Sequence, residues 1–298
     1  MQLNDLPQAE RAELERRLLH RPKVEAGRRA SNAQGSATGS ATDGPCPDAG
    51  HFPLSFAQQG VWFVHQIDPA SLSFNVATAV GINGQIRMTC LELAAASLVR
   101  RHEALRTHFD THEGQPMQVV SRVAPLVHCV ELSGPAGAAL GSQWRDHFGW
   151  TVVNRVFDVG RAPLFRIVAI SFAHDKHVVV CSCHHLIADE WSMALLVQDL
   201  AVLYGDLCLG RPSSLEAPAT QYSDYCAWQR EHLTPANLAE QQLYWSRQIS
   251  DDLVATELPL DKPRPAVSRF RGDREFLRFP RELTCRLKAL GMKHGCSL

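Results

Sequence analysis

The sequence has no excess of charge of either sign. Its 298 residues include 30 Lys and Arg against 31 Asp and Glu, which gives a formal net charge of −1 at pH 7. Nucleic acids and anionic membrane surfaces attract proteins through clustered positive charge. The balanced composition therefore gives no reason to expect nucleic acid or an anionic membrane as a partner.

The sequence also lacks a long apolar run. A helix that crosses a bilayer needs roughly 20 consecutive apolar residues, and no segment approaches that length. Residues 1–20 are charged and contain no apolar signal-peptide core. We therefore expect a cytoplasmic protein.

The nine cysteines have no regular spacing. An odd number without a secretion signal favours reduced thiols over a disulfide framework. The densest group is the C-x-C-H-H run Cys181-Ser182-Cys183-His184-His185, which has no second, separated pair of ligands of the kind structural zinc sites use. We interpret Cys181 and Cys183 as small apolar residues of a strand and expect no metal.

Strand and helix periods alternate along the rest of the chain. Residues 8–21 fit a short amphipathic helix, so residues 1–29 are expected as an N-terminal helical segment, and residues 30–51 as a flexible linker rich in Ala, Ser, Gly, Thr and Pro. Strands are expected at residues 74–82, 107–109, 117–120, 164–172, 177–183 and 275–279. Helices are expected at residues 89–102, 138–153, 191–207, 223–233, 237–249 and 282–292.

Two of these expected strands, residues 164–172 and 177–183, are separated only by the polar turn of residues 173–176. We expect them to form an antiparallel hairpin. The helix at 191–207 is expected to be buried, with Leu195, Leu196, Leu200 and Leu203 at helical spacing. Strands mixed with helices, at least one pair antiparallel, predict an α+β layered domain.

The strand at 177–183 runs directly into His184 and His185, and a helix follows within a few residues. Strand alternation places the two side chains on opposite faces, so one can point into a cavity while the other is held in the structure. Asp189 lies at or before the helix start, where its carboxylate could cap the helix or bind a cation that fixes the loop. The alternative is that both histidines are structural.

Four segments carry a resemblance to one family. His184-His185-x-x-x-Asp189, followed by Trp191-Ser192, resembles the HHxxxDG signature of condensation domains in non-ribosomal peptide synthetases. Three further segments match motifs of that family in the same order, namely Leu54–Gln59 with Trp62, Arg101–Thr107 with Phe109, and Tyr222–Gln229.

The resemblance implies two lobes, each a two-layer sandwich similar to chloramphenicol acetyltransferase, with the active site and a substrate tunnel between them. Residues 52–235 would form the N-terminal lobe, and residues 236–298 the beginning of an incomplete C-terminal lobe. The later motifs of the family are absent, so we expect an incomplete fragment with little turnover.

The resemblance also implies a reaction, in which a donor acyl or aminoacyl thioester and the amine of an acceptor aminoacyl thioester join in an amide bond. Both substrates arrive on phosphopantetheine arms of upstream and downstream carrier proteins, with an adenylation domain in the same synthetase and no directly bound cofactor. Two alternatives remain open. One is an acyltransferase of the same fold that uses a free alcohol or amine, and the other is a remnant that only binds carrier protein.

By the same resemblance, His185 faces the tunnel as a general base or as a residue that positions the amine. His184 shapes the loop, and Asp189 forms a structural ion pair with an arginine. Glu190, Trp191 and Ser192 are expected beside the substrate tunnel. The family usually has Gly where this chain has Glu190, whose side chain could narrow the tunnel or turn to solvent. The residues of the other motifs, including His102, Arg106 and Tyr222, are expected to be structural.

Overall fold

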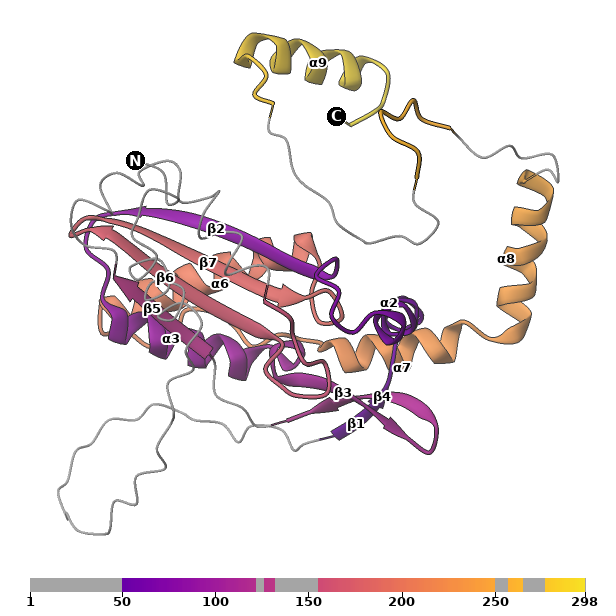
Figure 1. Ribbon diagram of the computed structural model, residues 1–298, viewed down its shortest axis with the longest axis horizontal. Coiled ribbons are helices and arrows are strands. Elements are labelled where there is room, and N and C mark those ends of the chain that lie inside the picture. The colour runs from indigo at the N-terminus through magenta and orange to yellow at the C-terminus, as the bar shows by residue number, and fades with distance from the viewer. Residues whose placement is uncertain (1–49, 122–125, 132–154, 250–256, 265–276, 298) are drawn as a thin grey trace. The chain divides into compact units, whose positions relative to one another are not determined.

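The computed structural model describes residues 50–121, 126–131, 155–249, 257–264 and 277–297 (Figure 1). The expected N-terminal helix, the linker up to residue 49 and the expected helix at 138–153 lie outside these residues. The chain divides into two compact units, Met1–Leu258 and Pro259–Leu298. The lobe boundary expected between residues 235 and 236 stays a prediction.

The larger sheet of the first unit has four strands in the order β2-β7-β6-β5. β6 (Phe165–Ala173) and β7 (Lys176–His184) form the expected antiparallel hairpin, and β2 (Asn75–Asn83) pairs antiparallel with β7 along its whole length. β5 (Leu126–Glu131), which the sequence pattern did not predict, adds to the other edge in parallel with β6. The long register of β7 with β2 and β6 fixes where this strand ends, at His184.

Two helices pack against each other and on one face of this sheet (Figure 1). They are α3 (Met88–Arg101) and α6 (Glu190–Cys208), both close to the ranges expected. Leu196, Leu200 and Leu203 of α6 are buried in the common core, whereas Leu195 is half exposed and is not part of it. The helices and sheet form a two-layer arrangement that confirms the α+β fold class.

A smaller antiparallel sheet has the strand order β1-β4-β3. It consists of β1 (Gly50–Pro53), β3 (Thr107–His112) and β4 (Gln115–Val120), with a short 3-10 helix, η2 (Glu103–Arg106), leading into β3. The two-residue turn between β3 and β4 is Glu113-Gly114, and both residues have positive φ, 51° and 77°. Turns of this geometry match the twist of paired strands, and β1 was not predicted because four residues carry too little pattern.

The described residues of the first unit also form the helices α2 (Phe56–Ile67), α7 (Tyr222–His232) and α8 (Pro235–Gln248). The sequence analysis predicted α7 and α8 but not α2. Its start nevertheless has a local signal, because Ser55 and Gln58 form a reciprocal capping box. α2 follows β1 closely, and Leu54, Ser55 and Gln58 of the segment Leu54–Gln59 are buried.

The described part of the second unit contains one helix, α9 (Arg281–Lys293), close to the expected range. Of the strand expected at 275–279, residues 277–279 are described and lie in no strand. Among the described residues, no helix combines the length and the apolar character that a membrane span requires.

Candidate active site

The segment His184–Asp189, here named the histidine loop, joins the end of β7 to the start of α6. His184 is 1% exposed, whereas His185 is exposed, so the two neighbouring imidazoles face opposite environments as strand alternation predicts. The backbone N–H of His184 donates to Leu164 O, and that of His185 donates to Phe74 O at 2.7 Å. The loop backbone is therefore held on both sides where it leaves the sheet.

His184 lies in an enclosed, largely aromatic environment. Its ring is near the rings of Phe74 and Phe157, and it meets His65 of α2 edge to face at 5.3 Å between centroids. Its Nδ1 accepts a hydrogen bond from the backbone N–H of Leu186 at 3.1 Å. Burial lowers the pKa of His184 to about 3, with smaller contributions from His65 and His185. This imidazole is neutral at pH 7 and is turned away from solvent, which fits the loop-shaping role expected for it.

His185 has a different hydrogen-bond arrangement. Its Nδ1 lies 3.0 Å from the carbonyl oxygen of Ala188. Because a carbonyl oxygen only accepts, Nδ1 must carry a hydrogen, and in the neutral ring Nε2 then holds a lone pair. The loop thus presents an exposed imidazole whose tautomer and ring orientation are fixed by the loop itself. Such a group can accept a proton or orient an N–H at Nε2.

Asp189 is the N-cap of α6. Its Oδ1 accepts hydrogen bonds from the backbone N–H of Ser192 at 2.7 Å and from the Ser192 hydroxyl at 2.5 Å. These hydrogen bonds from Ser192 hold the pKa of Asp189 below its usual value. The described residues include no arginine paired with Asp189, so the ion pair expected for it stays a prediction for the remainder of the chain.

Glu190 and Trp191 begin α6 and are both exposed, Trp191 to 78%. Glu113 is the only non-glycine residue with positive φ among those described, so position 190 has an ordinary backbone that needs no glycine. A carboxylate in the first helical turn is also favoured by the helix dipole. The position of Glu190, Trp191 and Ser192 beside a substrate tunnel stays a prediction.

A buried side chain of α2 forms a hydrogen bond with the backbone of the histidine loop. Gln58, 5% exposed, donates from Nε2 to the carbonyl oxygen of Leu186 at 3.0 Å. Its Oε1 accepts from the backbone N–H of Ser55 at 3.0 Å. The motif Leu54–Gln59 is thereby connected directly to the histidine loop, a role that the sequence analysis did not assign to Gln58.

α7 is attached to the same segment. Tyr222 Oη and Ser55 Oγ share a hydrogen bond at 2.9 Å, and the guanidinium of Arg230 donates to Leu54 O at 3.0 Å. The side chain of Gln229 accepts from the backbone N–H of Phe56 at 2.9 Å. These contacts between α7 and the start of α2 support the packing role expected for the motif Tyr222–Gln229.

The motif Arg101–Thr107 makes ion pairs and hydrogen bonds with the middle of α6 and with α7. Arg101 and His102 both contact Asp199 of α6, at 2.9 and 2.8 Å. Glu103 accepts from Ser223 of α7 at 2.9 Å and lies 3.4 Å from the buried guanidinium of Arg106. The contacts support the structural interpretation of this motif.

Cys181 and Cys183 are buried in β7 as expected, and burial raises both thiol pKa values to about 12.

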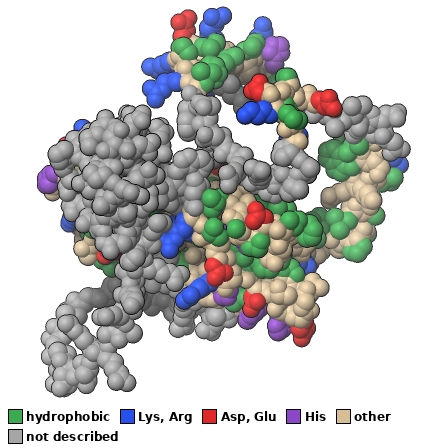
Figure 2. Space-filling view, in the orientation of Figure 1, with side chains coloured by type: hydrophobic (Ala, Val, Ile, Leu, Met, Phe, Trp, Pro, Cys, Tyr) green, Lys and Arg blue, Asp and Glu red, His purple; other side chains and the backbone are tan. Residues whose placement is uncertain are grey.

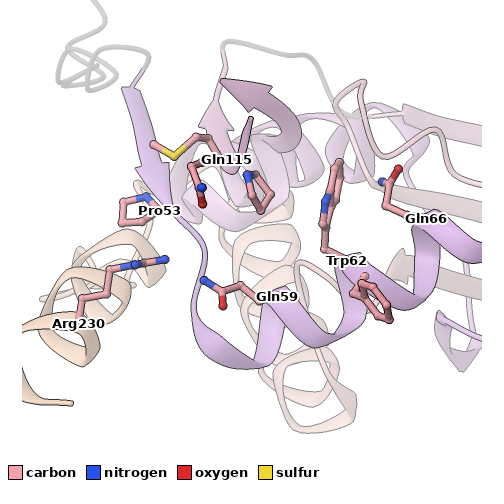
Figure 3. Close-up of a pocket in the computed structure, with 9 residues that line it drawn as sticks. Pro53, Gln59, Trp62, Gln66, Gln115 and Arg230 are labelled. Carbon is pink, nitrogen blue, oxygen red and sulfur yellow. The ribbon is translucent and has the colours of Figure 1, made fainter. Parts of the chain in front are cut away.

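A surface pocket of about 470 Å³ lies between α2, β4 and α7 (Figure 3). Its lining consists of Pro53, Gln59, Trp62, Phe63, Gln66, Gln115, Pro116, Met117 and Arg230. No residue of the histidine loop lines this pocket. The pocket is therefore separate from the exposed face of His185.

Residues 48–298 match the family of condensation domains. Among curated proteins, the chain is similar to chondramide synthase cmdD of Chondromyces crocatus, with 36% identity over 258 residues, and to malpinin synthetase of Mortierella alpina, with 35% identity over 248 residues. These matches cover 85% and 83% of this chain but only 6% and 3% of those proteins.

Two solved structures show the same fold. The first condensation domain of the CDA synthetase matches with a TM-score of 0.59 at 23% identity, covering 68% of this chain and 51% of that one. The starter condensation domain of rhizomide synthetase RzmA matches with a TM-score of 0.59 at 22% identity, covering 67% of this chain and 48% of that one. The chain thus spans about half the length of these solved domains.

Proposed function

The chain belongs to the condensation-domain family, and from that membership we propose that it takes part in forming an amide bond. A donor acyl or aminoacyl thioester reacts with the amine of an acceptor aminoacyl thioester. One observation assigns a part in this reaction to His185. Its Nδ1 donates a hydrogen bond to Ala188 O, which leaves the lone pair of the neutral, exposed imidazole on Nε2.

The reaction needs a free amine, because a protonated amine has no lone pair with which to attack. His185 Nε2 accepts a proton from the acceptor amine, or holds that amine in line with the thioester carbonyl. The C–N bond forms, the C–S bond breaks, and the proton passes to the departing thiolate. His184 is unsuited to this transfer, because it is buried and its pKa is lowered to about 3.

Both substrates are delivered on the phosphopantetheine arms of carrier proteins, one upstream and one downstream. The partners are those carrier proteins and an adenylation domain of the same synthetase. The similar proteins support this proposal. They are named a synthase and a synthetase, and this chain matches only a small part of each, so each has much further sequence outside the matched part. The thioester is an activated acyl donor, so the step needs no resident cofactor.

The test measures amide formation by mass spectrometry, with loaded donor and acceptor carrier proteins and the polypeptide in which this chain naturally occurs. We expect His185→Ala to abolish most of the product. His185→Gln separates the two roles, since a glutamine can hydrogen-bond the amine but cannot accept its proton. Loss of rate in both variants indicates a base, and partial retention by His185→Gln indicates positioning.

Other outcomes would overturn the proposal. Unchanged amide formation in His185→Ala would remove the role of that residue. Product formed only with a free alcohol or free amine would favour an acyltransferase of the same fold. Binding of a carrier protein with no product under any condition would favour a non-catalytic remnant.

A further inference from the structure

The last turn of α2 places a second buried imidazole against the histidine loop. His65 is 5% exposed, and its ring meets the ring of His184 edge to face at 5.3 Å between centroids. The sequence analysis assigned no role to His65. Burying an imidazole is unfavourable unless its polar atoms find partners, so the buried nitrogens of the two rings need hydrogen-bond partners.

The tautomer of His184 follows from its hydrogen bond. Nδ1 accepts from the backbone N–H of Leu186 and therefore carries no hydrogen. The ring is neutral at pH 7, because burial lowers its pKa to about 3. Its single hydrogen must therefore be on Nε2, which makes that atom a donor.

That donor is fully buried and has no hydrogen-bond partner among the described residues. The same is true of one nitrogen of the facing ring, His65 Nδ1. The rings of Phe74 and Phe157, which also adjoin His184, offer no ordinary acceptor. The two unpartnered nitrogens are complementary when His65 carries its hydrogen on Nε2, since Nδ1 is then an acceptor.

We propose that His65 is a positioning residue whose Nδ1 accepts the Nε2 hydrogen of His184 through one internal water, and so holds His184 in the tautomer that the histidine loop requires. The two nitrogens make no direct hydrogen bond. One water with two ordinary hydrogen bonds bridges groups roughly 5 Å apart, a span compatible with rings whose centroids are 5.3 Å apart.

The consequence for the loop is specific. With its hydrogen on Nε2, His184 accepts from Leu186 N–H, while Gln58 donates to the carbonyl oxygen of the same residue. Leu186 directly follows His185, so the first bond fixes the peptide that joins the exposed imidazole's residue to Leu186, and the second fixes the next peptide along the loop. A hydrogen placed on His184 Nδ1 would face the Leu186 N–H and break the first of these bonds.

Protonation of either buried histidine would disrupt the arrangement. The charged and titratable groups that influence the pair are His185 beside His184, and Asp68 and Asp158 near His65. The two aspartates favour a charged His65, whereas burial opposes it and has the larger effect. The pair is therefore held neutral, with one donor facing one acceptor.

The contact of His65 with His184 fixes the structure of the histidine loop whatever reaction the site performs. Only an effect of this contact on catalysis rests on the proposed function of His185. The tests below need no turnover, so a failure of the amide-forming proposal and a failure of this one give different results.

The test uses the full 298-residue chain and two variants of nearly equal size, His65→Asn and His65→Leu. An asparagine can place its amide oxygen near the position of the histidine Nδ1, whereas leucine removes the acceptor. In the unsubstituted chain, ¹⁵N chemical shifts should show His184 protonated at Nε2 alone. We expect His65→Asn to retain that tautomer and the slow hydrogen exchange of the Leu186 amide.

In His65→Leu, we expect exchange of the Leu186 amide at least about tenfold faster than in His65→Asn, because the buried donor of His184 loses its acceptor. Equal exchange rates in the two variants would overturn the proposal. So would an Nδ1-protonated His184 in the unsubstituted chain, a measurement that does not depend on the variants folding. A crystal structure with ordered waters and no density between the two nitrogens would also contradict it.

Discussion

At the scale of single residues, the site depends on two adjacent histidines with opposite environments. His184 is enclosed by aromatic rings and kept neutral, whereas His185 is exposed and its Nδ1 is hydrogen-bonded to Ala188 O. Neither residue type nor sequence spacing distinguishes them. The difference arises because His184 is the last residue of a strand buried on both faces, while His185 is the first residue beyond it.

The lowered pKa of His184 predicts a dependence of stability on pH. In the unfolded chain this imidazole has an ordinary pKa near 6.5, but in the folded chain the value is about 3. Below pH 6.5 the unfolded state therefore binds a proton that the folded state does not, and stability falls as the pH falls. We expect His184 alone to contribute a loss of about 2 kcal/mol between pH 7.5 and 5, measured by urea unfolding.

Two variants test the source of this effect. His184→Gln should flatten the dependence above pH 5, although His65 and His108, whose pKa values are also lowered by burial, contribute in the same direction. His174→Gln alters an exposed histidine and should leave the slope unchanged. An unchanged slope in His184→Gln would contradict the assignment.

Glu190 provides a second prediction at this scale. The backbone at this position is ordinary helix, so Glu190→Gly should destabilise the chain by up to about 1 kcal/mol through lost helix propensity and lost dipole interaction. If the side chain obstructs a tunnel, both Glu190→Gly and Glu190→Ala should raise the condensation rate in the native polypeptide. A rate that rises in neither variant would reject obstruction.

At the scale of elements, the candidate site is a strand, a five-residue connection and a helix. β7 ends at the buried His184, and Asp189 caps the N-terminus of α6. α2 then supports the connection through Gln58. The attachment through β7 is made by the backbone, whereas the Asp189 cap and the Gln58 contact each depend on one side chain and can be removed by one substitution.

The helix cap can be tested at Asp189. Asp189→Ala should cost about 1 kcal/mol in the free energy of unfolding, because it removes the acceptor for Ser192. Asp189→Asn should be nearly neutral, since asparagine is an equally good N-cap residue. Thermal or urea unfolding distinguishes them, and an Asn variant as unstable as the Ala variant would point to a required charge, as in the expected ion pair.

The link between α2 and the loop can be tested at Gln58. Gln58→Leu leaves the carbonyl of Leu186 and the N–H of Ser55 without their partners. A buried polar group left unpaired costs about 1–3 kcal/mol, so we expect a loss of that size or more in urea unfolding. The neighbouring Gln59→Leu changes a less buried side chain and should cost much less. Equal losses would show that the Leu186 contact is unimportant.

At the scale of the whole molecule, the chain spans about half the length of the solved condensation domains it matches. Several large apolar side chains of α7 and α8 are exposed, and Figure 2 shows hydrophobic side chains on the surface of α8. Those at 42% exposure or more are Tyr225, Trp228, Leu238, Leu243, Tyr244 and Trp245. Exposed apolar surface of this kind is typical of regions that contact other protein.

Because the chain spans only about half the length of the solved condensation domains, its activity can be predicted. If the site lies between two lobes, as the family resemblance implies, one lobe encloses it only partly. We therefore expect the 298-residue chain alone to form little amide product, and a longer polypeptide with the complete domain to form it readily. Product yields by mass spectrometry, with the same loaded carrier proteins, compare the two. Equal rates would show that this chain contains the entire catalytic apparatus.

The sequence by itself determined the local elements around the site. The apolar runs of β6 and β7, separated only by a short polar turn, predict their hairpin, and the periodic leucines predict α6. The position of Asp189 before that helix allows a cap, which the structure contains. These features were predictable because their stabilising contacts join residues close together in the chain.

Tertiary structure alone decided how the loop is supported. The parallel addition of β5, the contact of Gln58 with Leu186 and the contact of His65 with His184 all join segments far apart in the sequence. The pair Ser55 and Gln58 has the pattern of a capping box, which predicts the start of α2. No local pattern indicates that side chains of this helix will contact Leu186 and His184. The environments of His184 and His185 depend on such contacts, since burial and hydrogen-bond partners are properties of the folded chain.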